Sequence, residues 1–234
     1  MEHRTRWLIT AALAVVPLAC TADEPADDAA DTAPEPAAAE APAPAPTTEG
    51  PYAGWQVRTD GDVPPEGVTV TAIDGGWEID NGPAVVLWNE ARTAEGSYTL
   101  TATFEQLDSK GMVHGTGLVF GGSDLDGPDQ AYTYFMVRGD GDYLVKTRAG
   151  ESTAWVLPSG AWTGHDSIQV DDADGRYTNE LSVEVGDSET VFRVNGAEVH
   201  RAATADLPTD GLFGVRLNHN LTIRVTDLAV DGGM

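Results

Sequence analysis

Short segments of alternating apolar and polar residues recur about every ten residues from position 51 to the end of the chain, with turn residues between them. Alternation with a period of two is typical of half-buried β-strands, and this region has almost no helical periodicity. The dipeptides Gly75-Gly76 and Asn195-Gly196 lie between such segments. Asn-Gly tolerates positive φ at both central positions of a tight hairpin. The pattern therefore predicts an all-β domain.

The alternating segments predict about a dozen strands, at 68–73, 77–80, 84–88, 98–105, 117–121, 132–138, 143–148, 152–157, 181–185, 191–194, 197–200, 211–218 and 221–230. This number of strands favours a two-sheet antiparallel jelly-roll sandwich over a small barrel. We expect a single domain over 51–234, because a chain of that length buries about 70% of its unfolded surface. The only cysteine, Cys20, lies outside this region, so the core forms without disulfides.

The net charge of the predicted domain limits its partners. Residues 51–234 contain 11 Lys and Arg against 29 Asp and Glu, a net charge of −18. Nucleic-acid binding needs Lys and Arg to replace phosphate counterions, so we expect no nucleic-acid partner. The same sign of charge disfavours binding of the domain itself to anionic lipid headgroups.

The predicted hairpin at 132–148 is the strongest candidate for a binding site. A three-residue loop at 139–141 with a glycine bulge puts Phe135, Val137, Val145 and Thr147 on one face, and on the other Tyr132, Tyr134, Met136, Arg138, Lys146 and Arg148. A two-residue loop would scatter this set. Aromatic rings stack on the C–H groups of sugars, and cations bind hydroxyls or an acidic substituent, so these residues with Trp88 predict a glycan site. The alternative is a solvated face whose cations offset neighbouring carboxylates.

Two further groups of residues are candidates for catalysis or metal binding. His114 precedes a predicted strand and His219 lies in a polar turn, and either could act as an acid or base, or be an ordinary loop residue. Asp124, Asp126 and Asp129 form an Asp-Gly loop that offers oxygen ligands for a structural Ca²⁺. The spacing does not match a helix-loop-helix calcium site, and Asp and Gly also populate ordinary turns, so no cofactor is predicted firmly.

The N-terminal sequence predicts that the protein is exported from the cytoplasm. Arg4 and Arg6 precede an apolar run of about ten residues that ends near Cys20, as in a secretory signal. Residues 17–20, Pro-Leu-Ala-Cys, resemble the lipobox of bacterial lipoprotein precursors, with proline where leucine is usual. The resemblance implies a signal peptide at 1–20, a lipid on Cys20, and a domain anchored to the membrane of the cell envelope by that lipid alone. Residues 21–50 are acidic and rich in Pro and Ala, which predicts a disordered tether.

Central and C-terminal segments resemble those of concanavalin A-like jelly rolls. The matching segments are 117–122, 132–141, 181–185, 191–199 and 211–217, within a resemblance that covers about residues 65–231. That group includes laminin-G-like modules and the 3-keto-disaccharide hydrolases, so the resemblance implies a carbohydrate-related function. It leaves an enzyme acting on oxidised glycosides as an alternative, with His114, Asp124 or Asp126 carrying the proton and Arg138 or Lys146 stabilising an enolate. A non-catalytic envelope structural or adhesion module is the third alternative.

Overall fold

The computed structural model describes residues 52–61 and 63–233. These residues form fifteen strands and one short 3-10 helix, which are β1 (Gln56–Thr59), β2 (Thr69–Ile73), β3 (Gly76–Asn81), β4 (Val85–Ala94), β5 (Tyr98–Asp108), β6 (Gly115–Ser123), β7 (Ala131–Arg138), β8 (Asp142–Ala149), β9 (Ser152–Trp155), β10 (Thr163–Gly164), β11 (Tyr177–Val185), β12 (Glu189–Val194), β13 (Ala197–Ala203), η1 (Thr204–Asp206), β14 (Gly211–Leu217) and β15 (Leu221–Gly232). Over the same residues, no helix has the length and apolar character needed to cross a membrane.

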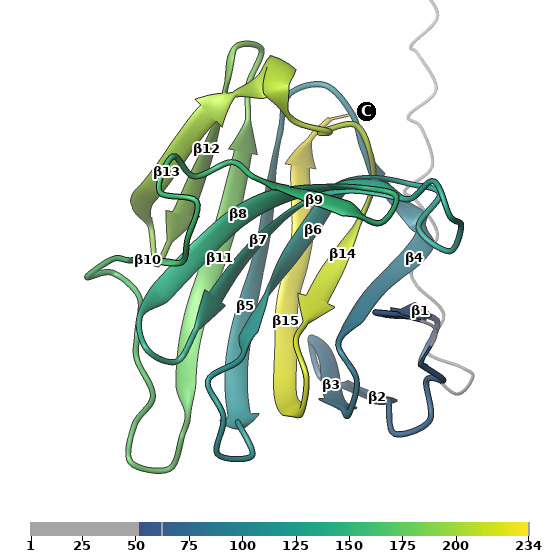
Figure 1. Cartoon of the computed structure of the whole chain (residues 1–234), viewed down its shortest axis with the longest axis vertical. Coiled ribbons are helices and arrows are strands. Elements are labelled where there is room, and N and C mark those ends of the chain that lie inside the picture. Colours follow the sequence, from purple (N-terminus) through teal and green to yellow (C-terminus); the bar gives the residue numbers. More distant parts are fainter. Residues whose placement is uncertain (1–51, 62, 234) are drawn as a thin grey trace, which may run out of the picture. The chain divides into compact units, whose positions relative to one another are not determined.

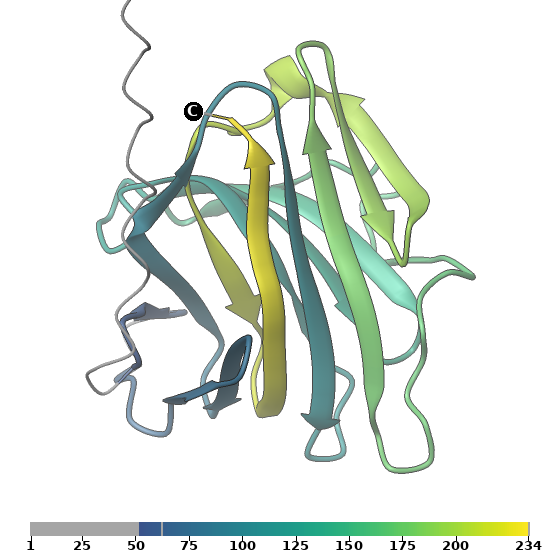
Figure 2. The same ribbon diagram turned by 180° about the vertical axis from the view of Figure 1, so that it is seen from behind.

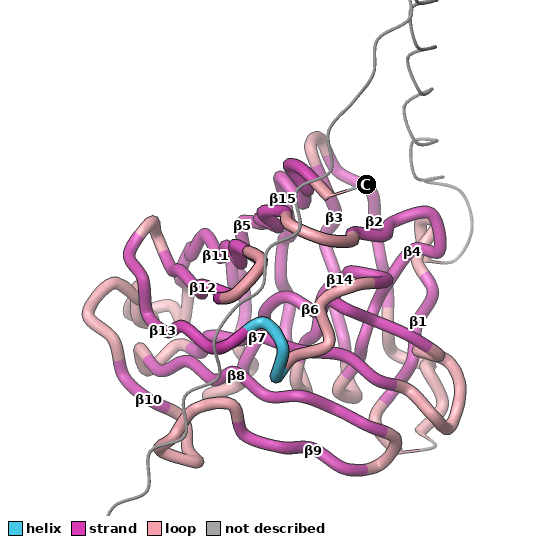
Figure 3. The backbone as a smooth tube through the Cα atoms, turned by 90° about the horizontal axis from the view of Figure 1, so that it is seen from above, coloured by secondary structure: helices cyan, strands magenta, loops and turns pink. Residues whose placement is uncertain are grey.

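The strands form two antiparallel sheets that lie face to face (Figures 1 and 3). Sheet A has eight strands in the order β1-β4-β14-β6-β7-β8-β10, and β9 pairs with β8 beside β10. Sheet B has seven strands in the order β13-β12-β11-β5-β15-β3-β2, and its long strands β5, β11 and β15 stand in front in Figure 2. This arrangement confirms the prediction of an all-β, two-sheet antiparallel sandwich.

The main core fills the space between the sheets, because every second residue of the long strands points inward. In β5 the buried positions alternate strictly with half-buried ones from Tyr98 to Gln106. Phe135 from sheet A meets Phe192 from sheet B at a centroid distance of 5.3 Å, and both are fully buried. A fully buried side chain of this size contributes about 1.5–3 kcal/mol, so pairs like this hold the sheets together without a disulfide.

The hairpin of β7 and β8 has the register that its three-residue loop predicts. The amide of Gly141, at φ 89°, donates to the Arg138 carbonyl, and the pairing then runs Tyr134 opposite Lys146 and Tyr132 opposite Arg148. Phe135 opposite Val145 belongs to the other face, which joins the main core. The hairpin therefore presents its tyrosines and cations on the outer face of sheet A.

The structure adds two strands to those predicted from the sequence and extends others. β1 has four residues and β10 only two, which is too short for alternation to be recognised. β4 continues to Ala94, beyond the predicted end at residue 88. The predicted signal peptide, Cys20 and the tether at 21–50 lie outside the described residues.

Candidate functional site

Four basic side chains gather on the outer face of sheet A, which we call the cationic face: Arg58, Lys146, Arg148 and Arg216. Strand pairing puts them in register with residues of a second, smaller hydrophobic cluster on that face, formed by Val86, Trp88, Val119, Leu125, Tyr132, Tyr134, Met136 and Leu144. The face thus collects four of the 11 basic residues of a domain with 29 acidic ones.

Arg216 lies deepest in the cationic face. It is 7% exposed, donates to both carboxylate oxygens of Asp60, and its Nη1 is 3.3 Å from the Tyr132 hydroxyl. Its guanidinium lies 5.3 Å from the centroid of the Tyr134 ring. Burial opposes the ionisation of Asp60, but the hydrogen bond and charge of Arg216 outweigh it, and the Asp60 pKa is lowered. Asp60 is therefore the charged partner that allows Arg216 to be buried.

Gln130 joins Arg58 to Arg148 without neutralising either. In the amide orientation that satisfies its neighbours, the Gln130 oxygen accepts from Arg58 Nη2 at 2.8 Å and from Arg148 Nε and Nη2 at 3.3 Å. Arg58 also donates to two loop carbonyls, those of Leu125 and Gly127. Two like charges are thus held in fixed positions by neutral acceptors.

A cavity of about 370 Å³ opens beside these two arginines. It is lined by the basic residues Arg58 and Arg148, by the acidic residues Asp126 and Glu151, and by Val57, Thr59 and Gly61. Arg148 makes only long ion pairs here, 3.6 Å to Glu151 and 3.9 Å to Asp60, and the Glu151 side chain is 83% exposed. The arginine charge facing the cavity is therefore only weakly balanced.

Two indole rings, each beside a cation, lie at different positions along the hairpin. The Lys146 ammonium is 4.7 Å from the centroid of Trp155, which is opposite it on β9. The Arg138 guanidinium is 4.6 Å from the centroid of Trp162. Trp155 is exposed and Trp162 is half-buried. Partial burial, and then the positive charges of Arg216 and Arg148, lower the pKa of Lys146, so this amine shares one field with the two arginines.

The structure corrects the part that three aromatic residues were expected to play. Trp88, Tyr132 and Tyr134 lie on the predicted face, but Trp88 and Tyr132 are each 1% exposed and Tyr134 is 6% exposed. The Trp88 indole donates to Glu90 at 2.6 Å. These rings are packed into the cluster on the outer face, so their faces are not open to stack on a sugar.

Arg138 lies on the same outer face of sheet A but at the turn of the hairpin, where its charge is neutralised locally. Its Nε donates to Asp140 at 2.8 Å and its Nη2 to Asp142 at 2.5 Å, so both carboxylates neutralise it. The predicted set of cations therefore divides into two groups. The positive charges of Arg148 and Arg216 act on Lys146, whereas Arg138 pairs with the carboxylates of the turn and lies over the Trp162 ring.

His114 and His219 meet at the end of sheet A where β6 begins and β14 ends. Their ring centroids are 5.8 Å apart. Partial burial, and then the charge of His219, lower the pKa of His114, which favours its neutral form near pH 7. Asp126, an alternative to His114 as the predicted proton carrier, lines the cavity beside Arg58. The predicted histidine and aspartate thus belong to separate groups of residues.

In the loop of Asp124, Asp126 and Asp129, the structure shows Asp124 bound to the backbone of its own turn. The Asp124 carboxylate accepts the amide of Asp129 at 2.9 Å, and the Asp124 carbonyl accepts the amide of Gly127. Asp124 therefore stabilises its own turn, as an aspartate commonly does. Within 52–61 and 63–233, no three carboxylate, histidine or cysteine side chains are arranged to hold a metal ion.

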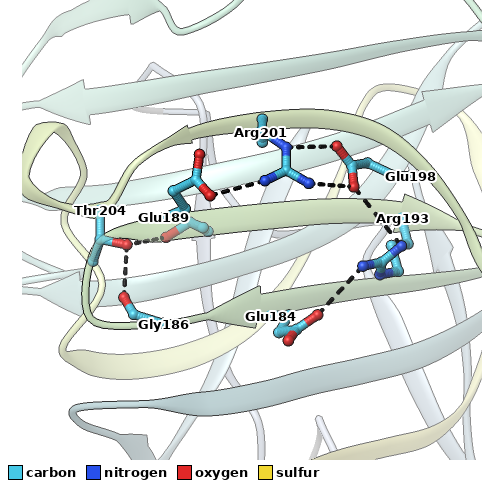
Figure 4. A network of polar contacts seen from close by, with 8 residues as sticks. Glu184, Gly186, Glu189, Arg193, Glu198, Arg201 and Thr204 are labelled. Carbon is cyan, nitrogen blue, oxygen red and sulfur yellow. Dashed lines mark hydrogen bonds and ion pairs between the residues drawn. The ribbon is translucent and has the colours of Figure 1, made fainter.

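The basic residues of sheet B have a different environment. Arg201 is held at 2.8 Å by both Glu189 and Glu198, and Arg193 lies 3.5 Å from Glu184 (Figure 4). Arg224 is 3.0 Å from Glu78. In contrast, no carboxylate oxygen of the described residues lies within 4.0 Å of the Lys146 ammonium. The three arginines of sheet B are thus neutralised in place, whereas Lys146 and Arg148 of the cationic face are only partly so.

Sequence reasoning missed Arg58, Asp60, Gln130, Trp155, Trp162 and Arg216. Of these, Trp155 could have been predicted from the sequence. A two-residue turn at Gly150-Glu151 puts it opposite Lys146. The partners Asp60 and Arg216 are 156 positions apart, and no local pattern reveals such a pair.

Comparison with known proteins establishes the fold of this chain. No family model and no curated protein sequence matches it. The carbohydrate-binding module CBM66 from Bacillus subtilis is 12% identical, with 76% of this chain and 96% of that one covered and a TM-score of 0.54. A Bacillus subtilis protein of unknown function with a galectin-like fold is 14% identical, with 75% and 88% covered and a TM-score of 0.54. A native glycosidic hydrolase is 9% identical, with 81% and 96% covered and a TM-score of 0.50. The chain therefore has a jelly-roll, galectin-like fold.

Proposed function

We propose that this protein binds carbohydrate on the outer face of sheet A, at the surface formed by Trp155, Lys146 and Arg148. The observation that carries the proposal is the exposed Trp155 ring, which lies beside an ammonium that no described carboxylate neutralises. An indole face stacks on the C–H groups of a sugar ring, and Lys and Arg donate to its hydroxyls. Trp155 thus takes the part that the sequence assigned to the buried tyrosines.

The fold supports the proposal without deciding it. Proteins with similar structures include a carbohydrate-binding module and a glycosidic hydrolase. A fold hosts many functions, so the argument depends on the residues of the cationic face. The finer resemblance to 3-keto-disaccharide hydrolases stays a hypothesis: His114 lies beside His219, and Asp126 lines the cavity with Arg58 and Arg148.

We also propose that the protein is a lipoprotein of the cell envelope. Cys20 follows the apolar run of a secretory signal, and the acidic residues 21–50 would separate the lipid from the domain. Metabolic labelling with an alkyne fatty acid tests this directly. We expect label on the expressed protein and none on the Cys20→Ala variant, and equal labelling of the two would contradict the proposal.

Binding of the full chain to a panel of neutral and acidic oligosaccharides tests the carbohydrate proposal. We expect at least one glycan to bind and the Trp155→Ala variant to lose about tenfold in affinity, since a stacked aromatic contributes about 0.5–1.5 kcal/mol beyond its buried area. Val170→Ala, which changes an exposed apolar residue of another loop, is the matched control. A glycan that binds Trp155→Ala as tightly as the native chain would exclude this site.

A further inference from the structure

We propose that the carbohydrate bound by the cationic face is acidic, and that its carboxylate or sulfate group contacts Lys146 and Arg148. This inference rests on the proposed carbohydrate-binding function and adds the class of ligand. It follows from how the basic residues of the two sheets are neutralised.

The cations of the two sheets are paired unequally with carboxylates. On sheet B, Arg201 has two carboxylates at 2.8 Å (Figure 4). On the cationic face, Arg148 reaches its two carboxylates at only 3.6 and 3.9 Å, and the charge of Lys146 faces the Trp155 ring. Residues 51–234 contain 29 acidic against 11 basic residues, so a group of partly balanced cations beside one cavity indicates a site for an external anion.

Neutral acceptors hold the arginines of the cationic face in fixed positions. Gln130, a buried residue, accepts from both Arg58 and Arg148, and the Gly150 carbonyl accepts from Arg148 Nε at 2.9 Å. These acceptors fix the guanidinium planes before a ligand arrives, which lowers the ordering cost of binding. A fixed guanidinium fork matches the two oxygens of a carboxylate or sulfate.

The cavity beside Arg58 and Arg148 is large enough to hold an anionic group. The cavity of about 370 Å³ is lined by Arg58 and Arg148, and its acidic residues Asp126 and Glu151 are exposed. Glu151, 83% exposed and 3.6 Å from Arg148, is a weak partner that a ligand carboxylate can replace. Asp60 stays with the buried Arg216. The net charge of the domain repels a distant anion, but at physiological salt this field is screened beyond about 8 Å, and contacts at the face decide binding.

Isothermal titration of the full chain with trigalacturonate, with its carboxyl-reduced neutral counterpart and with a sulfated galacto-oligosaccharide tests the inference. We expect an acidic ligand to bind at least tenfold more tightly than the neutral one, and the two acidic ligands distinguish a carboxylate from a sulfate. Equal binding of neutral and acidic ligands would overturn the inference and leave the carbohydrate-binding function standing. Absence of binding to all three ligands and to the wider panel would overturn both.

Three variants locate the anion. Lys146→Gln and Arg148→Gln are each expected to lower the affinity for the acidic ligand about tenfold while leaving the thermal transition intact. Glu151→Gln removes the competing carboxylate and is expected to raise that affinity about threefold, a gain that misfolding cannot imitate. Arg224→Gln on sheet B is the matched control and should change nothing. Unchanged affinity in both Lys146→Gln and Glu151→Gln would place the anion elsewhere.

Discussion

Replacing Asp60 by asparagine removes the carboxylate that accompanies the buried Arg216, together with its 3.9 Å ion pair to Arg148. Breaking a buried ion pair by removing one partner costs about 3–5 kcal/mol, because the other charge remains without compensation. The Asp60 side chain is 37% exposed, so water can reach part of the vacated site, and we reduce the expected cost to about 2–3 kcal/mol. In a domain of this size that lowers the Tm by about 4–12 °C.

Thermal and urea unfolding at pH 7 measure this cost. Asp166→Asn, an exposed loop carboxylate, is the control and should stay within about 0.5 kcal/mol of the native protein. The double variant Asp60→Asn with Arg216→Met should be more stable than the sum of the single changes predicts, because the uncompensated charge is then gone. An Asp60→Asn cost below about 0.5 kcal/mol, or strict additivity of the two changes, would refute the account of Arg216 as a buried charge that depends on Asp60.

The pH dependence of the Asp60 contribution has a definite sign. The pKa of Asp60 is lowered in the folded protein, so the ion pair stabilises fully above the unfolded value near 3.9. Its contribution is lost as pH falls through the lower folded pKa. The difference in unfolding free energy between the native protein and Asp60→Asn should therefore be constant above about pH 5. It should decrease as the pH falls below about 4.

Two further variants and a pH titration test the fold. Phe135→Ala removes a fully buried ring that meets Phe192 at 5.3 Å, and urea unfolding should show a loss of about 3–5 kcal/mol. Gly196→Ala at φ 79° puts a side chain in a left-handed turn position with nothing within 4 Å, so the same assay should show a purely backbone cost of about 1–2 kcal/mol. Burial raises the pKa of Tyr132, Tyr143 and Tyr177, and raises that of Tyr134 to about 12, so phenolate absorbance at about pH 11 should be far lower in the native than in the unfolded protein. Because these raised values keep protons on the folded state, stability should fall as pH rises above about 10, and a full phenolate signal from the native protein would contradict this burial.

The sheets could be predicted from the sequence because their information is local. Alternation identifies which residues of a strand face the core, and the three-residue loop ending at Gly141 fixes the partner of each residue in the β7–β8 hairpin. That is why Tyr134 and Lys146 lie on one face, as predicted. Strands such as β10, with two residues, carry no such pattern.

The environment of the site could not be predicted in the same way. Alternation says that Trp88 points to the outer face of sheet A, but not that Leu125 joins it there in a second buried cluster. The neighbours of Arg148, Asp60 and Gln130, are brought to it by strand order and by a loop and not by sequence spacing. Burial on an outer sheet face depends on such loops, whose course has no period to recognise.

Chemical shifts of the indole N–H groups test the central claim most directly, because they report where on the sandwich a carbohydrate binds. A ¹H–¹⁵N spectrum of the full chain, recorded during titration with a glycan that binds, follows its six tryptophans separately. We predict that the Trp155 signal shifts strongly and the Trp162 signal weakly, whereas the buried Trp55 and Trp77 stay unchanged. Saturation by a glycan with no shift at Trp155 would contradict the assignment of the cationic face as the binding site.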